Sequence, residues 1–276
     1  GFAESIDSDV AIVGALMKMS GLLPKGFELK PYLREAAGQL YEETDYAREG
    51  AHLSNFNTLL KDDPKFSLPK LIPEWSTDRI LSMTFVAGEP IENAETLPQD
   101  QRDRIAHDLI ALMLKELFSF GTMQTDPNFA NYRYNPDTQQ IILLDFGATR
   151  DISAKISDQY KRLIKAGMAQ DQSALHDLSI EIGFFTDQTA DQHKTQIIQL
   201  MQMVFDALLR APIFDFADTS LTQDLQAKGI ALADSGFVPP PLPIDILFLQ
   251  RKFGGMFLLA NKLKARVAVA EMLEQI

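Results

Sequence analysis

The sequence contains no cysteine, which excludes disulfide bonds, thiolate catalysis and cysteine-ligated zinc. Positive charge is also scarce, because 26 Lys and Arg face 38 Asp and Glu, for a net charge of −12. Such a surface repels phosphate backbones, so we expect no nucleic-acid partner. Histidine occurs four times, and no two histidines stand at a metal-ligand spacing. Any anionic ligand must therefore be held by local cations, backbone amides or a metal ion.

Long apolar runs are missing as well. The most apolar stretch, residues 244–265, is interrupted by five charged residues, so we expect no transmembrane segment. The first residues include Glu4, Asp7 and Asp9 in place of the basic and apolar regions of a signal peptide. These features predict a cytoplasmic protein from a bacterium, a location that also allows peripheral contact with the inner membrane.

What the chain does contain is an ordinary globular composition, with 46% hydrophobic and 23% charged residues among 276. Apolar periodicity predicts a mixed, mostly helical protein. The expected helices cover residues 1–23, 31–60, 99–120, 153–169, 173–182, 191–209, 221–234 and 244–265. Strands are expected at residues 68–72 and 79–86, and a hairpin at residues 132–134 and 141–144 with its turn at Asn135-Pro136-Asp137.

The hairpin lies between three polar residues that stand out: Asp126, Asn131 and Asp145. Folding the hairpin brings Asn131 and Asp145 to neighbouring strand ends, and Asp126 begins the loop that leads to Asn131. Asp145 opens an Asp-Phe-Gly sequence. Protein kinases bring together the same three groups, which are a base for the hydroxyl proton, an Asn, and an Asp-Phe-Gly aspartate that binds magnesium. The alternative is a structural turn beside a buried aspartate.

Two further segments carry candidate residues. Glu43 falls on the apolar stripe of the helix over residues 31–60, so it requires a cationic partner, whereas Glu42 and Glu49 are typical of a solvated helix face. Asp45 follows Glu43 in a Glu-x-Asp pattern. In a two-lobed kinase, the second strand would end where adenine meets the backbone. That position corresponds to Met83 through Val86, including Phe85.

These residues resemble the UbiB family of atypical kinases, also called the AarF or ABC-one family, most closely its members in coenzyme Q (ubiquinone) biosynthesis. The resemblance covers nearly the whole chain. It is carried by the following motifs: Glu43-Thr44-Asp45-Tyr46, Gln124-Thr125-Asp126-Pro127-Asn128, Leu144-Asp145-Phe146-Gly147-Ala148-Thr149-Arg150, Val238 to Pro241, Arg251-Lys252-Phe253-Gly254-Gly255 and Lys262-Leu263-Lys264-Ala265-Arg266.

The resemblance implies an α+β, protein-kinase-like fold. A partial N-terminal lobe would cover residues 1–86 with a small antiparallel sheet and a long helix. A helical C-terminal lobe with a family-specific extension would cover residues 87–276. Asp126 would be the catalytic base, Asn131 and Asp145 would bind Mg²⁺, and Glu43 and Asp45 would belong to the family's Glu-x-Asp network. ATP and Mg²⁺ are the implied cofactors, and nucleotide, quinone-biosynthesis proteins or lipid precursors the implied partners.

The sequence departs from the family upstream of the long helix. An alanine-rich phosphate-covering loop, a strand lysine and a Lys-x-Gly-Gln motif are absent, and Ala36-Ala37-Gly38-Gln39 only mimics the last of these. We therefore expect the chain to be the C-terminal two-thirds of a longer protein and inactive alone. A truncated nucleotide lobe is the alternative.

Three functions remain open at this point. The first is an atypical kinase or ATPase that supports ubiquinone biosynthesis. The second is a non-catalytic nucleotide-binding scaffold of a lipid-biosynthesis complex. The third is a metal-dependent phosphoesterase, which would need two metals close together.

Overall fold

The computed structural model describes residues 10–13, 15, 29–30, 33–34, 37–38 and 44–276. The chain divides into two compact units. Unit 1 comprises Gly1–Glu89 and Asn131–Thr149, and unit 2 comprises Pro90–Ala130 and Arg150–Ile276. The chain therefore leaves unit 1, returns to it for the hairpin, and leaves it again.

From Thr44 onward, unit 1 contains helix α3 and a small mixed sheet. Helix α3 (Tyr46–Leu59) buries Gly50, Leu53 and Phe56. The sheet has the order β1-β5-β4-β2, with β1 (Phe66–Ser67), β5 (Gln140–Leu143), β4 (Tyr132–Asn135) and β2 (Glu89–Pro90). Strand β1 runs parallel to β5, whereas β4 and β5 are antiparallel. The inner strand β5 buries Ile141, Ile142 and Leu143, so it supplies the apolar centre of the sheet.

The predicted hairpin is confirmed. Tyr132 pairs with Leu143, and Asn135 pairs with Gln140. The side chain of Asn135 accepts hydrogen bonds from the amides of Asp137 and Thr138, at 2.9 and 3.2 Å. This is the Asx-type turn for which Asn is favoured, since its short amide can satisfy the backbone of the turn.

The continuous helix expected over residues 31–60 is wrong at Thr44 and Asp45. Residues 33, 34, 37 and 38 are helical, but Thr44 lies in a turn and Asp45 is not helical. The carboxylate of Asp45 accepts a hydrogen bond from the Arg48 amide at 3.0 Å and begins α3 as its N-cap. A short acidic side chain competes for backbone donors and so favours a helix start over a helix interior. Of the helix expected over residues 1–23, residues 10–13 and 15 are helical, and the remainder lies outside the described residues.

The strands expected at residues 68–72 and 79–86 are also wrong as regular strands. Single bridges join Leu71 to Met83 and Thr77 to Ile80. The hydroxyl of Thr84 accepts the Lys70 amide at 2.9 Å, and the hydroxyl of Ser76 accepts the Ser82 amide at 3.0 Å. Hydroxyl side chains therefore take amides that a regular ladder would use.

Unit 2 is almost entirely helical. Its elements are η2 (Ile91–Thr96), α4 (Gln99–Lys115), η3 (Glu116–Phe120), β3 (Thr122–Gln124), α5 (Ala154–Met168), α6 (Gln172–Ile182), α7 (Asp191–Leu209), β7 (Phe214–Asp215), α8 (Ser220–Asp234), α9 (Ile244–Lys262), β8 (Arg266–Val267) and α10 (Val269–Glu274). Strand β3 pairs with β6 (Thr149–Asp151), and β7 pairs with β8. The helices expected from periodicity are confirmed to within a few residues, because their apolar stripes face a common core.

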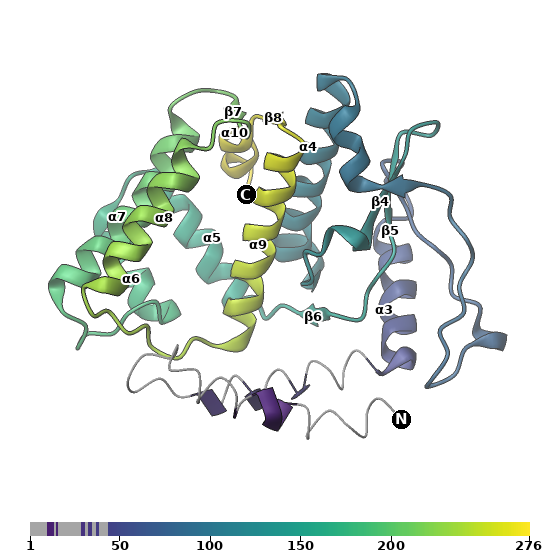
Figure 1. Ribbon diagram of the computed structural model, residues 1–276, viewed down its shortest axis with the longest axis horizontal. Coiled ribbons are helices and arrows are strands. Elements are labelled where there is room, and N and C mark those ends of the chain that lie inside the picture. Colours follow the sequence, from purple (N-terminus) through teal and green to yellow (C-terminus); the bar gives the residue numbers. More distant parts are fainter. Residues whose placement is uncertain (1–9, 14, 16–28, 31–32, 35–36, 39–43) are drawn as a thin grey trace. The chain divides into compact units, whose positions relative to one another are not determined.

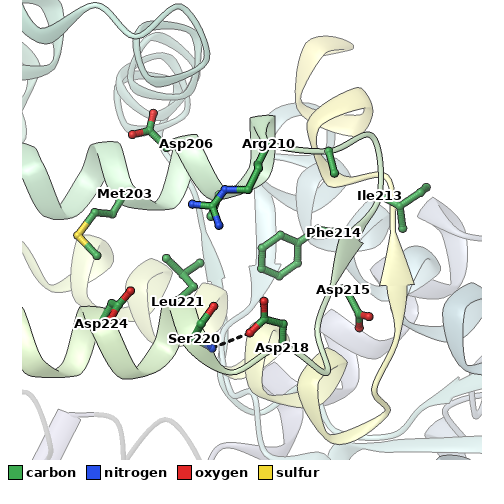
Figure 2. A pocket seen from close by; sticks show the side chains of 12 residues that line it. Met203, Asp206, Arg210, Ile213, Phe214, Asp215, Asp218, Ser220, Leu221 and Asp224 are labelled. Carbon is green, nitrogen blue, oxygen red and sulfur yellow. Dashed lines mark hydrogen bonds between the residues drawn. The ribbon is translucent and has the colours of Figure 1, made fainter.

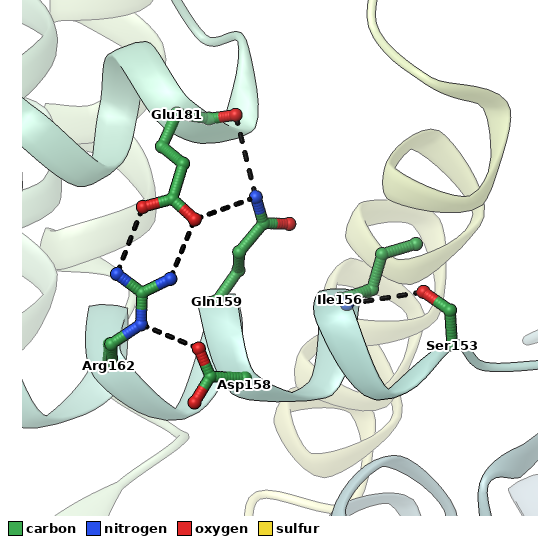
Figure 3. A network of polar contacts seen from close by, with 6 residues as sticks. All are labelled: Ser153, Ile156, Asp158, Gln159, Arg162 and Glu181. Atoms are coloured by element: carbon green, nitrogen blue, oxygen red, sulfur yellow. Dashed lines mark hydrogen bonds and ion pairs between the residues drawn. The ribbon is translucent and has the colours of Figure 1, made fainter.

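Two packing groups make up unit 2. Helices α4 and α9 lie side by side, as do α7 and α8 (Figure 1). Helices α5, α6, α7 and α8 form the second group around a buried cluster. Its residues are Ala166, Leu175, Leu178, Phe185, Ile197, Ile198 and Leu232. On its surface, Arg162 of α5 donates to both carboxylate oxygens of Glu181 in α6, at 2.9 and 2.6 Å (Figure 3). This two-pronged contact fixes α5 against α6 by geometry as well as by charge.

Helix α4 does not end in a regular turn. It continues into a single π-helical turn, η3, and Gly121 follows with a φ of 65°. A π turn inserts an extra residue and rotates the following side chains, and such turns are frequent at functional sites. Here the turn begins at Glu116, which is buried, and leads into β3 and the loop that carries Asp126.

Candidate functional site

Asp145 and Asn131 stand at neighbouring strand ends of unit 1, as predicted from the hairpin. Strand β4 begins directly after Asn131, and β5 ends two residues before Asp145. The Leu144 amide donates to the Asn131 carbonyl at 3.1 Å, which extends the pairing of the two strands by one step. Asn131 is buried, with 8% of its surface exposed, whereas Asp145 is exposed. A carboxylate is thus presented to solvent from the end of a buried strand.

The chemistry of these two side chains suits a magnesium ion. Oδ1 of Asp145 accepts the Gly147 amide at 2.9 Å, which fixes the rotation of the carboxylate. Among the described residues, no group of three or more His, Cys, Asp and Glu could hold a metal alone. Magnesium does not require such a cage, since it binds through one or two protein oxygens together with the phosphates of a nucleotide. The Asp145 carboxylate and the Asn131 side-chain oxygen are ligands of that kind.

Helix α3 holds the segment that follows Asp145. The Arg48 guanidinium donates to the carbonyls of Gly147, at 3.1 Å, and of Thr149. The ring of Phe56 lies 4.9 Å from the ring of Phe146, and both side chains are fully buried. The conformation after Asp145 is therefore set by α3 through both polar and apolar contacts.

Glu49 is a site residue that the sequence analysis missed. We expected it on a solvated face, but it is half-buried, and its carboxylate accepts the Phe146 amide at 3.4 Å. A Cβ atom on Gly147 would lie 3.4 Å from the same carboxylate. A signal was present in the sequence, because Glu49 shares the i, i+4, i+7 face of α3 with the buried residues Leu53 and Phe56.

The predicted Glu-x-Asp pair is only partly described. Glu43 lies outside the described residues. Asp45 is exposed and acts as the N-cap of α3, the helix that supports Phe146 and Gly147. Its place in a wider catalytic network stays a prediction.

The predicted adenine segment lies in unit 1, between the bridge at Met83 and strand β2. Met83 and Val86 are half-buried, and Phe85 is 91% exposed. Within the described residues, the backbone amides of Phe85 and Val86 donate no hydrogen bond. The segment is anchored just afterwards, because Arg133 donates to the Gly88 carbonyl at 2.9 Å and Asn135 to the Ala87 carbonyl at 3.2 Å. A fixed backbone with available donors can bind an adenine edge.

Asp126 belongs to unit 2, where it forms an ion pair with Arg251 of α9. Nη2 of Arg251 lies 2.7 Å from Oδ1 of Asp126, and the two side chains are 49% and 22% exposed. Both motifs stand out in the sequence, but their contact was not predicted. No local pattern links two residues 125 positions apart.

A buried polar cluster supports the start of the same loop. Nζ of Lys252 lies 3.2 Å from Oε1 of Gln124 and 3.8 Å from Oε2 of Glu116. Oε1 of Glu116 accepts the Gln124 amide at 3.2 Å. Burial raises the pKa of Glu116, and the Lys252 ammonium and the Gln124 amide oppose that rise without cancelling it. The cluster ties α9, the π turn and β3 together.

Unit 2 also contains a cavity of about 360 Å³ between α7, β7 and α8 (Figure 2). Four carboxylates and the Arg210 guanidinium line it, beside apolar side chains that include Phe214 and Leu221. Of the predicted site residues that the structure describes, none lies in this wall. The cavity is therefore separate from the loop that carries Asp126.

In the part of the chain that the structure describes, no helix is both long enough and apolar enough to cross a membrane.

Comparisons with known proteins identify the family of this chain. The family described as the ABC1 atypical kinase-like domain matches residues 1–179. The protein named "Atypical kinase COQ8B, mitochondrial" of Danio rerio is 35% identical over 99% of this chain and 43% of its own length. "Atypical kinase COQ8, mitochondrial" of Saccharomyces cerevisiae is 34% identical over 100% of this chain and 55% of its own length. The chain spans about half the length of the curated relatives it matches.

A solved structure supports the fold. The complex of Rv3197 with erythromycin from Mycobacterium tuberculosis has a TM-score of 0.74 and 17% sequence identity, covering 100% of this chain and 68% of that chain. At this identity the likeness concerns the fold alone, and it confirms the α+β, kinase-like fold expected from the sequence. Since the family match covers well over half of the residues and the atypical kinases align along nearly the whole chain, this chain belongs to the ABC1 atypical kinase-like family.

Proposed function

We propose that the chain forms the main part of an atypical kinase or ATPase that binds ATP with Mg²⁺ and supports ubiquinone biosynthesis. Its reaction is the hydrolysis of ATP or the phosphorylation of a small molecule. Membership of an atypical kinase family supports the reaction class. The partners we propose are the nucleotide together with quinone-biosynthesis proteins or lipid precursors.

One observation carries the proposal. Asp145 presents an exposed carboxylate from the end of buried strand β5, beside Asn131 at the start of β4. The residues that follow Asp145 are held by Arg48, Glu49 and Phe56 of α3. Such a carboxylate is rigid before any ligand arrives, and preorganisation of this kind gives electrostatic stabilisation its value in catalysis.

Asp145 and Asn131 would hold the Mg²⁺ ion, which supplies neutralisation of phosphate charge when bound. That neutralisation matters here because the chain carries a net charge of −12. Met83, Phe85 and Val86 would bind adenine through the backbone. Asp126 would orient a hydroxyl group or a water molecule and take its proton.

The experiment is an Asp145→Asn substitution in the intact protein. We expect it to abolish the rise in melting temperature that ATP and Mg²⁺ together produce. Asp137→Asn is the matched control, because it removes the same charge from the exposed turn of the same hairpin. An unchanged nucleotide response in the Asp145→Asn protein contradicts the assignment.

A second candidate function is a nucleotide-binding scaffold without catalysis. The ion pair between Asp126 and Arg251 favours it, because this carboxylate already has a partner within the chain. Complementation of a quinone-deficient strain with the Asp126→Asn protein separates the two. Full rescue supports the scaffold, whereas failure with normal folding supports chemistry at Asp126.

The location of the chain stays a prediction from its sequence. The relatives carry the word mitochondrial in their names, which describes those proteins. For this chain we propose a cytoplasmic location with peripheral contact at the inner membrane of a bacterium.

A further inference from the structure

Helix α9 makes three contacts with the end of strand β3 and the loop of Asp126 that follows it. Arg251 pairs with Asp126 at 2.7 Å, and Lys252 donates to Gln124 at 3.2 Å. A Cβ atom on Gly255 would lie 2.0 Å from Cβ of Pro127, so only a glycine allows this approach. Arg251 and Gly255 are four residues apart and share one face of the helix, and Lys252 adjoins it. Three neighbouring residues on one side of α9 therefore contact Gln124, Asp126 and Pro127.

The contacts of Lys252 and Gly255 are buried, whereas that of Arg251 is exposed, and we therefore distinguish their roles. Lys252 and Glu116 are 3% and 2% exposed, so their ion pair lies inside the unit and can form in only one register of α9. Gly255 brings the helix backbone against Pro127, the residue directly after Asp126. These two contacts fix the position of the Arg251 backbone relative to the loop of Asp126.

Arg251 itself is half-exposed, and its hydrogen bond to Asp126 comes from Nη2 alone. A single charge-assisted hydrogen bond to Oδ1 restricts the rotation of the carboxylate. The stem of Arg251 is fixed by Lys252 and Gly255 on the same helix. Helix α9 therefore holds one oxygen of the Asp126 carboxylate through Arg251.

We propose that Arg251 is a positioning residue for Asp126, and that α9 uses Lys252 and Gly255 to set the register in which Arg251 works. This inference rests on the proposed function, because it depends on Asp126 acting in the reaction. Arg251 acts through Asp126 and makes no contact with the nucleotide. Loss of its guanidinium lets the carboxylate rotate away from the reacting hydroxyl.

The test uses Arg251→Met and Arg251→Lys in the intact protein, with ATP turnover and ATP affinity measured separately. We expect Arg251→Met to lower kcat on the order of 10- to 100-fold, the scale of a small misplacement of a catalytic group. The dissociation constant for ATP with Mg²⁺ stays within about twofold of the wild type. Arg251→Lys recovers part of kcat, since it retains the charge but not the geometry of the guanidinium.

Lys262→Met is the control, because Lys262 lies on the same helix and forms an exposed ion pair with Glu95 at 2.9 Å. We expect its kcat to equal that of the wild type. A wild-type protein without turnover refutes the proposed function. A wild-type protein with turnover that Arg251→Met leaves unchanged refutes the positioning role alone. Loss of ATP affinity in step with kcat also refutes it, because Arg251 would then bind the nucleotide directly.

Discussion

Lys252 and Glu116 form an ion pair inside unit 2, with Nζ 3.8 Å from Oε2 and with 3% and 2% of the two side chains exposed. Two charges removed from water lose hydration, and Gln124 replaces part of it, because its side-chain oxygen accepts from Lys252 and its backbone amide donates to Glu116. Lys252 is adjacent to Arg251 in α9, and Glu116 contacts Gln124 just before the loop of Asp126. The position of α9 therefore depends on this ion pair.

Removing one partner of this pair leaves the other charge buried. We expect Lys252→Met to lower the free energy of unfolding by about 3–5 kcal/mol, measured by urea denaturation. Lys262→Met removes an exposed ion pair on the same helix and should cost less than about 1 kcal/mol. Equal losses of unfolding free energy in the two variants would show that the buried ion pair contributes no more to stability than the exposed one.

Glu116 makes stability depend on pH in a definite direction. Burial raises its pKa above the ordinary value of 4.5, so the folded state binds a proton more tightly than the unfolded state does. The resulting stabilisation is complete below pH 4.5 and is lost as the pH rises through the folded-state pKa. We expect the stability of the wild type relative to Glu116→Gln to fall as the pH rises from 4.5 through the folded-state pKa of Glu116. A difference that is constant over this range, or that rises with pH, contradicts the raised pKa.

The two adjacent glycines of α9 provide a matched pair of substitutions. A Cβ atom on Gly254 meets nothing within 4 Å, whereas one on Gly255 meets Pro127 at 2.0 Å. Gly254→Ala should stabilise the protein by about 0.5–1 kcal/mol, because alanine restricts the unfolded chain and favours the helix. Gly255→Ala should destabilise it by about 1–3 kcal/mol through overpacking, and should also lower kcat.

The measurements are thermal denaturation and ATP turnover of both variants. Full activity of the Gly255→Ala protein would mean that the contact between α9 and Pro127 serves stability alone.

Arg48 offers a test of the support that α3 gives to the segment after Asp145. Arg48→Lys replaces a fork that reaches the carbonyls of Gly147 and Thr149 with a single ammonium. We expect a loss of about 1 kcal/mol in the stabilisation that ATP with Mg²⁺ confers, measured as a shift in melting temperature. Arg79→Lys is the control, since the Arg79 side chain is 89% exposed. A nucleotide response as large in Arg48→Lys as in Arg79→Lys would assign Arg48 to folding only.

Local signals in the sequence predicted the hairpin and most helices of unit 2. Asn135 and Asp137 define a turn, and the alternation of Tyr132 and Tyr134 with polar residues defines a strand. The break at Asp45 was missed because the apolar stripe continues across it, while the decisive interaction is one side-chain hydrogen bond to Arg48. The strand predicted around Thr84 was wrong for a similar reason, because the Thr84 hydroxyl accepts the Lys70 amide that a regular ladder would use.

The supports of the site were the least predictable part. Glu49 could have been found from its helix face, but its partner at Phe146 is 97 positions away. The contacts of Arg251 and Lys252 with Asp126 and Gln124 span more than a hundred residues. Apolar periodicity predicts which face of a helix is buried, but it does not predict which residues pack against that face. Only packing of the whole unit selects those partners.

The measurement that tests the central claim most directly is a titration of the intact protein with Mn²⁺ in the presence of ATP, with free Mn²⁺ followed by electron paramagnetic resonance. Mn²⁺ takes the same oxygen ligands as Mg²⁺ and can be observed directly. We predict that the wild-type and Asp137→Asn proteins bind Mn²⁺ with the nucleotide, and that Asp145→Asn weakens this binding by about tenfold or more. Equal Mn²⁺ affinity in all three proteins would contradict a nucleotide-metal site at the end of β5.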